Sequence, residues 1–176
     1  MKTVVNAILI IIAFLLQSTL FSRFTVAGIT PNLLLIVVAS IGFLSGRRRG
    51  LIAGFFAGLL FDVFFGSVYG LYACIFMYIG FTNGIFQKLL FPNDIKLPLG
   101  LIVVSDFLYG HICYLFMFLF RGDLGYGYYL LNIILPEVVY TVVIACVLFP
   151  LIQTVYRKIS AFEEKETDTI GYKKYG

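Results

Sequence analysis

The chain has 176 residues, of which 61% are hydrophobic and 12% are charged, with a formal net charge of +4. An average soluble domain carries about 25% charged residues, so this composition excludes an ordinary soluble globular domain. The apolar runs are continuous rather than alternating in polarity, which excludes a membrane β-barrel. Runs of about 20 apolar residues are long enough to cross a bilayer as helices. We therefore expect an all-α polytopic membrane protein, a compact bundle of about six transmembrane helices.

Six apolar segments predict the helices in chain order. The first, residues 4–21, is followed by no convincing cleavage site, so we expect a retained helix and not a signal peptide. The second run, residues 25–46, contains Pro31 and Asn32, and we place Pro31 in the first turn of a shortened helix. We expect the remaining helices at residues 50–65, 71–86, 99–120 and 129–155, the last with Pro136 and Pro150 inside it.

The distribution of basic residues predicts the orientation. With six helices, eleven of the 13 lysines and arginines lie on the side of the two termini, and only Arg23 and Arg121 lie on the other side. By the positive-inside rule both termini are cytoplasmic. We expect one transmembrane domain, residues 1–156, followed by a charged cytoplasmic tail, residues 157–176, that is partly disordered.

The third apolar segment carries the most distinctive pattern. Gly50, Gly54, Gly58 and Asp62 recur every four residues, so they lie on neighbouring turns along one ridge of a helix. Small residues at this spacing allow the backbones of two membrane helices to approach closely. The ridge fits packing within the bundle or docking of another protein, and its neighbours Arg47, Arg48 and Arg49 fit a topological anchor or a site for anionic lipid.

Four ionisable side chains are expected inside the membrane: Asp62, Asp106, His111 and Glu137. Each costs about 2.5–3.5 kcal/mol at the centre of a helix, so each needs a role. One interpretation is a proton or ion pathway, and the other is a set of hydrogen bonds between helices. We favour the second for Asp106 and His111, and we expect Asp62 to bond the backbone that approaches the glycine ridge.

The sequence offers no set of residues for catalysis. It has one histidine, and its three cysteines lie inside apolar runs without the spacing of a metal site. Asp62 and Asp106 formally match the two aspartates of an intramembrane aspartyl protease, but the residues around them resemble neither signature of that class. We therefore expect no enzymatic activity, no cofactor and no metal, and no interaction with nucleic acid.

The chain resembles the rod shape-determining membrane protein MreD family in length, helix layout and motifs. A proline and a polar residue, Pro31 and Asn32, open the second helix, and basic residues, Arg47, Arg48 and Arg49, end it. A G-x-x-x-G-L-x-x-D helix comes next, and Gly70 begins the segment after it. Pro136 and Glu137 in the last segment also resemble the family pattern.

This resemblance implies a non-enzymatic subunit of the machinery that elongates the cell wall, in the bacterial cytoplasmic (inner) membrane. The implied partners are an MreC-like bitopic protein, the MreB filament, the RodA glycosyltransferase and a class B penicillin-binding protein, together with membrane lipids. The resemblance also makes the ridge, Asp62 and the arginines elements of packing and docking.

A second interpretation comes from gross layout alone. A small, basic six-helix membrane protein is also similar to the vitamin-binding S-components of energy-coupling-factor transporters. That function requires an outward-facing pocket for a small molecule, for which the outer turns at residues 66–70 and 121–129 are the candidates.

Overall fold

The computed structural model describes residues 2–21, 29–66, 70–89, 95–117 and 125–175, with side chains up to Glu163. The expected outer turns at residues 66–70 and 121–129 lie partly outside these residues, as do Arg23 and Arg121. In the described part the chain forms six helical segments. Their elements are α1 (Lys2–Leu16) with η1 (Gln17–Phe21), α2 (Leu33–Ser45), α3 (Arg47–Phe65), α4 (Leu71–Ile85) with η2 (Phe86–Leu89), α5 (Lys96–Met117), and α6 (Tyr126–Tyr129) with η4 (Leu130–Ile134) and α7 (Leu135–Tyr175).

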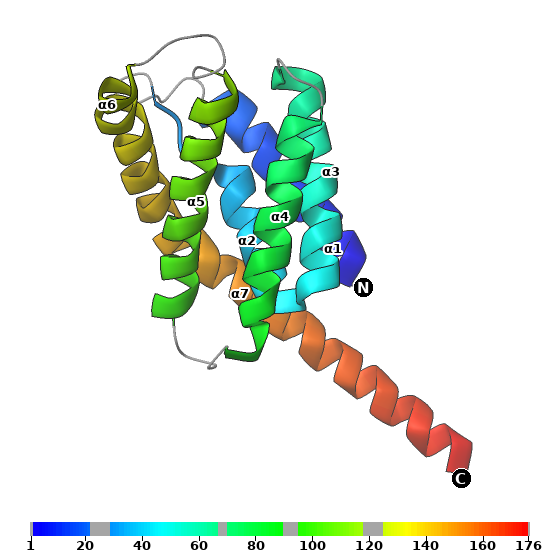
Figure 1. Ribbon diagram of the computed structural model, residues 1–176. Helices are drawn as coiled ribbons and strands as arrows, with labels where there is room; N and C mark the ends of the chain where they lie inside the picture. The colour runs from blue at the N-terminus through cyan, green and yellow to red at the C-terminus, as the bar shows by residue number, and fades with distance from the viewer. Residues whose placement is uncertain (1, 22–28, 67–69, 90–94, 118–124, 176) are drawn as a thin grey trace.

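The helix α2 is the centre of the bundle. Every residue from Leu33 to Phe43 is buried, and the other long helices surround it (Figure 1). A helix that is apolar on all sides is stable only when it is buried on all sides. At 1.5 Å per residue its 13 residues rise about 20 Å, less than the ~30 Å hydrocarbon core. The helix α2 by itself is therefore too short to cross that core.

The hairpin of α3 and α4 is the tightest helix pair in the bundle. The sequence placed Arg47, Arg48 and Arg49 at the end of the preceding helix, and this is wrong: they form the first turn of α3. The reason is Gly46, whose φ of 88° ends α2 and turns the chain directly into α3. Three cations in a first helical turn oppose the helix dipole, so their presence there needs a reason other than helix stability.

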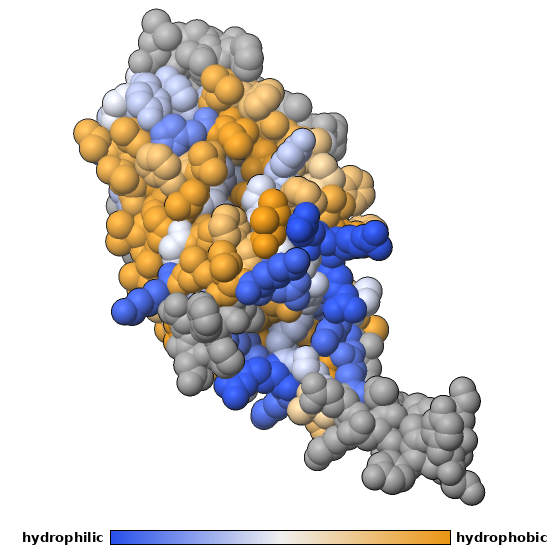
Figure 2. Space-filling model, turned by 60° about the horizontal axis from the view of Figure 1, so that its bottom comes forward, coloured by the Kyte–Doolittle hydropathy of each residue, from blue (hydrophilic) through white to orange (hydrophobic). Residues whose placement is uncertain are grey.

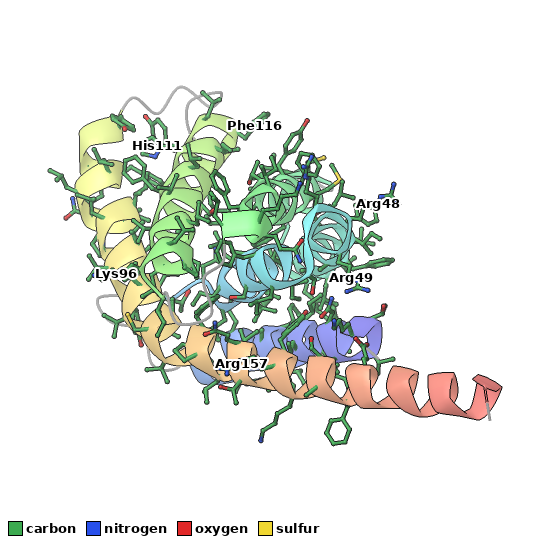
Figure 3. The ribbon with its side chains drawn as sticks, turned by 90° about the horizontal axis from the view of Figure 1, so that it is seen from below. Arg48, Arg49, Lys96, His111, Phe116 and Arg157 are labelled. Atoms are coloured by element: carbon green, nitrogen blue, oxygen red, sulfur yellow. The ribbon has the colours of Figure 1, made fainter. Side chains whose placement is uncertain are left out.

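The last segment is one continuous helical stretch that bends and then extends beyond the bundle (Figure 1 and Figure 3). It begins at Tyr126, slightly before the predicted start. Within η4 the N–H of Leu135 donates to the carbonyl of Leu130, five residues back, and this wider turn accommodates Pro136 just after it. The helix α7 then continues to Tyr175, through the tail for which partial disorder was expected.

Three helical stretches in the described part of the chain are long and apolar enough to cross a membrane: Lys2–Thr19, Lys96–Phe116 and Tyr126–Glu163. The all-helical bundle agrees with the expected fold class. Because α2 is short and buried among the other helices, its length alone does not show whether it crosses the membrane.

Candidate functional site

Asp62, at the end of α3, caps the first turn of α4. Its Oδ1 accepts the N–H of Tyr72 at 3.1 Å, and its Oδ2 accepts the N–H of Ala73 at 2.9 Å. The residue before α4 is Gly70, which has no side chain with which to cap the helix. Since the first N–H groups of a helix have no partner within it, the carboxylate of α3 takes the place of a local N-cap. Asp62 is 1% exposed.

The glycines of α3 allow this contact. A Cβ at Gly50 would overlap with the carbonyl of Gly80, a Cβ at Gly54 with that of Phe76, and a Cβ at Gly58 with the backbone of Ala73. All three obstacles are backbone atoms of α4, which cannot rotate away as a side chain can. The structure thus places the whole ridge against α4 and inside the bundle.

Two glycines of α4 complete the hairpin, and our sequence reasoning did not single them out. A Cβ at Gly80 would overlap with the carbonyl of Gly50, and a Cβ at Gly84 would meet the backbone of Arg47. Their spacing of four residues is a signal that the sequence does contain. Gly70 has a different role: its φ is 91° and the space around it is open, so it serves the left-handed turn into α4.

The first backbone N–H groups of α2 have hydrogen-bond acceptors in Gln17 of η1 and in the N-cap residue Asn32. The N–H of Leu34 donates to Gln17 Oε1 at 3.0 Å, and that of Leu35 to Oδ1 of the N-cap residue Asn32 at 3.1 Å. The N–H of Asn32 donates to Thr141 Oγ1 of α7 at 3.1 Å. The expected position of Pro31 in the first turn is wrong, because Pro31 precedes the N-cap and its carbonyl accepts the N–H of Leu33.

Substitution of Asn32 by alanine is expected to destabilise the protein by about 0.5–2 kcal/mol, the usual cost of losing an N-cap. The cost applies because Asn32 and Leu35 are buried, so water has little access to the N–H of Leu35. Stability is measured by heating a variant in which Cys74 and Cys146 are serine, so that labelling of the buried Cys113 reports unfolding. Ser40→Ala is the control, since Ser40 bonds only the Ile36 carbonyl of its own helix; equal effects of the two substitutions would contradict the role of the cap.

Glu137 and Asp106 approach each other where α5 packs against η4 and α7. Asp106 is 1% exposed, and neither of its oxygens has a hydrogen-bond partner among the described residues. The hydroxyl of Thr141 and the carboxyl of Glu137 both lie close enough to act on it electrostatically. The two carboxyls therefore lie within range of electrostatic interaction although 31 positions separate them in the chain.

His111 lies apart from this pair, on the side of α5 that faces α6 (Figure 3). Its Nδ1 is 2.8 Å from the carbonyl oxygen of Phe107, which requires Nδ1 to be the donor. Its Nε2 then accepts the hydroxyl of Tyr126 at 2.6 Å. His111 thus links α5 to α6, and its ring nitrogens are occupied by these bonds.

Basic residues gather at the end of the bundle where α3 and α5 begin. Arg48, Arg49, Lys96 and Arg157 are seen from this end in Figure 3, and Figure 2 shows hydrophilic residues concentrated there beside an apolar surface. Lys2 at the start of α1 pairs with Glu163 of α7 at 3.0 Å. This ion pair places the first residues of the chain at the same end as the tail.

A groove of about 310 Å³ lies between α4 and α5. Its lining is mostly apolar, and two of its hydroxyls are already used. Thr82 donates to carbonyls of its own helix, and Ser105 accepts the side-chain amide of Asn83 at 2.8 Å. The described part of the chain contains no group of three His, Cys, Asp or Glu residues arranged to hold a metal ion.

The comparisons with known proteins gave one match. A family model described as "rod shape-determining protein MreD" matches residues 1–159, which is the whole chain except nearly all of the tail. Neither the comparison with curated proteins nor that with solved structures produced a match.

Proposed function

The chain belongs to the rod shape-determining protein MreD family, and from this premise we propose that it is a non-enzymatic, multi-pass subunit of the wall-elongation machinery in the bacterial cytoplasmic membrane. It scaffolds partner proteins through the outer surfaces of its helices. A role in rod-shape determination follows from membership of the family, and the scaffolding mechanism is our inference. The observation that carries it is that the glycine ridge and Asp62 are used inside the hairpin, so contacts with partners fall to the exposed helix faces and the basic end.

The orientation that we propose has six spans and cytoplasmic termini. It is supported by the Lys2–Glu163 pair and by the arginines in the first turn of α3. Those arginines lie in the position that is unfavourable for a helix dipole but favourable for retention in the cytoplasm and for anionic headgroups, which contribute about 1 kcal/mol per charge.

One exposed stripe on η4 and α7 is the best candidate for docking a bitopic partner. It repeats every four residues and consists of Leu131, Leu135, Val139, Val143, Val147, Leu151 and Val155, each at least 38% exposed. Each step of four residues turns about 40° around the helix, so the stripe winds around α7, and its middle members Val139, Val143 and Val147 share the face on which a partner helix can pack. Valine loses little rotamer freedom when a helix packs on it.

The occupant that we propose is the transmembrane helix of an MreC-like bitopic protein. A second copy of this chain packed in parallel would bring Arg157 and Lys158 of the two copies together at the end of the stripe, which disfavours self-association. The MreB filament, RodA and a class B penicillin-binding protein belong to the wider complex on this proposal.

The test is to place bulky side chains on the stripe, where they fit among lipid chains but obstruct the packing of a partner helix. A Val139→Phe, Val143→Phe double variant is expected to accumulate and fold as the wild type does, yet to leave cells that lack the native chain rounded. Ile8→Phe and Ile12→Phe together, on an exposed face of α1, form the matched control and are expected to restore rods. Normal rods with the α7 variant would contradict docking on the stripe.

Nothing in the family match, or in the part of the chain that the structure describes, favours the alternative function as an S-component of a vitamin transporter. The groove between α4 and α5 is mostly apolar, and two of its hydroxyls are bonded within the protein. A vitamin site needs several polar groups that converge on the ligand.

A further inference from the structure

The neighbourhood of Asp106 is set by close packing of α5 against the last segment. A Cβ at Gly110 would touch only the side chain of Ile134, at 3.0–3.4 Å, so these two residues face each other. One turn further along each antiparallel helix come Asp106 on α5 and Glu137 on α7. Thr141, one turn beyond Glu137, binds the N–H of Asn32, so the pair lies beside the buried start of α2.

No positive charge faces this pair in the described part of the chain. The titratable side chains around it are Tyr72 of α4, Tyr109 and Cys113 of α5, and Tyr129 of α6. Asp62 of α3 acts on Tyr72, and α2 contributes only Asn32. The described arginines and lysines lie at the basic end, and His111 bonds Phe107 and Tyr126.

The start of α2 does not supply the missing partner either. The N–H groups of Leu33, Leu34 and Leu35 donate to Pro31, Gln17 and Asn32, and that of Asn32 donates to Thr141. Asp106 differs in this from Asp62, whose two oxygens accept two backbone N–H groups. Asp106 is buried and Glu137 is half-buried, so two deprotonated carboxylates at this place would be poorly solvated like charges without a compensating cation, which is unfavourable in the protein interior.

We propose that Asp106 and Glu137 form a proton-binding pair that holds at least one proton at neutral pH and joins α5 to α7 beside the start of α2. A protonated carboxyl is a hydrogen-bond donor. Thr141 Oγ1 has a second lone pair after accepting the N–H of Asn32 and is close to Asp106. Thr141 can also donate its own hydroxyl hydrogen to an ionised Asp106, so it can partner either form, and the proton is favoured because no positive charge faces the two carboxyls.

The pair lies at the junction between two parts of the bundle. The helices α2, α3 and α4 pack extensively on one another, whereas α5 has few contacts with α4 and is held mainly by α7 and α2. Loss of the shared proton puts like charges between α5 and α7 in a medium of low dielectric constant, where repulsion is strong. Ionisation of the pair therefore loosens α5.

The test is infrared spectroscopy of the full chain in lipid nanodiscs. A protonated carboxyl has a C=O stretch that a carboxylate lacks, and the wild type is expected to show this band at neutral pH. The band is expected to disappear in the Asp106→Asn, Glu137→Gln double variant and to remain in Asp62→Asn. Absence of the band from the wild type at neutral pH, or its persistence in the double variant, would overturn the proposal.

A second measurement applies if the double variant folds with a lower yield than the wild type. Thermal stability of the wild type is expected to fall as pH rises from about 4, where carboxyls of an unfolded chain titrate, through neutral, because the unfolded chain releases these protons at a lower pH than the folded pair does. The double variant has no carboxyl at either position and is expected to lose this dependence. Equal pH dependence of the two proteins would contradict a proton-binding role, whatever the effect on cell shape.

Discussion

Asp62→Leu is expected to destabilise the protein strongly, by about 1–3 kcal/mol for each of the two buried N–H groups that it leaves without an acceptor. The donors are the backbone N–H groups of Tyr72 and Ala73, and neither lipid nor leucine can accept their hydrogen bonds. The loss is measured as the temperature at which Cys113 becomes reactive in the background that lacks the other two cysteines. Val63→Leu, on the exposed side of the same helix, is the control.

Asp62→Asn removes the charge and keeps the shape of the side chain, but it also changes which hydrogen bonds the side chain can make. An amide has one acceptor oxygen and one NH₂ donor, whereas the site presents two N–H donors to the two oxygens of Asp62. We expect the asparagine variant to lie between wild type and leucine in stability. Wild-type stability in both variants would contradict the capping role of Asp62.

Gly54→Leu is expected to prevent the α3–α4 hairpin from closing. Even a Cβ at this position overlaps with the backbone carbonyl of Phe76, and overpacking by a few methylene groups costs about 1–3 kcal/mol where side chains can adjust. Backbone atoms of a neighbouring helix adjust less. We therefore expect little folded protein, and rounded cells when this variant is the only copy.

The graded series Gly54→Ala, Gly54→Val and Gly54→Leu distinguishes loss of packing against α4 from loss of partner docking. Stability of the purified protein and restoration of rod shape are expected to fall together along the series, because the ridge faces α4 and not a partner. Phe56→Leu, at an exposed position of α3, is the control. A Gly54→Leu protein that is as stable as wild type but fails to restore rods would contradict this and place a partner on the ridge.

The spacing of residues in the chain predicted one face of a helix correctly but not what it meets. Period-four glycines ending in Asp62 define a ridge on any helix, and the structure places all four of these residues on one buried side of α3. Which helix covers that side depends on tertiary packing. Gly80 and Gly84 allow α4 to pack over the ridge. The spacing of residues alone does not predict that α4 packs on α3.

The centre of the bundle was the hardest feature to predict. Residues 25–46 have the composition of an ordinary lipid-facing span, and hydropathy does not separate lipid from protein interior, since both are apolar. Pro31 and Asn32 did indicate a shortened helix. Gln17 and Thr141, which bind at its start, are polar residues of distant segments, and only the packing of α1 and α7 on α2 brings them there.

Asp106 and Glu137 show the same limit. Each was recognised as a charge that needs a reason inside the membrane, but their proximity depends on the register of α5 against α7, which Gly110 and Ile134 set. The arginines after Gly46 were assigned to the end of the second helix, but the positive φ of Gly46 ends α2 before them, and they begin α3. A glycine followed by three cations is compatible with either assignment.

The central claim is that this chain holds a bitopic partner at its outer surface. The most direct measurement is site-specific photo-cross-linking in living cells, with the photoreactive residue at Val143 on the exposed stripe or at the buried Ala145 two positions away. We predict that Val143 cross-links to the MreC-like bitopic protein and that Ala145 does not. Cross-linking of Val143 to lipid alone, while the partner is captured from another helix or not at all, would contradict the account.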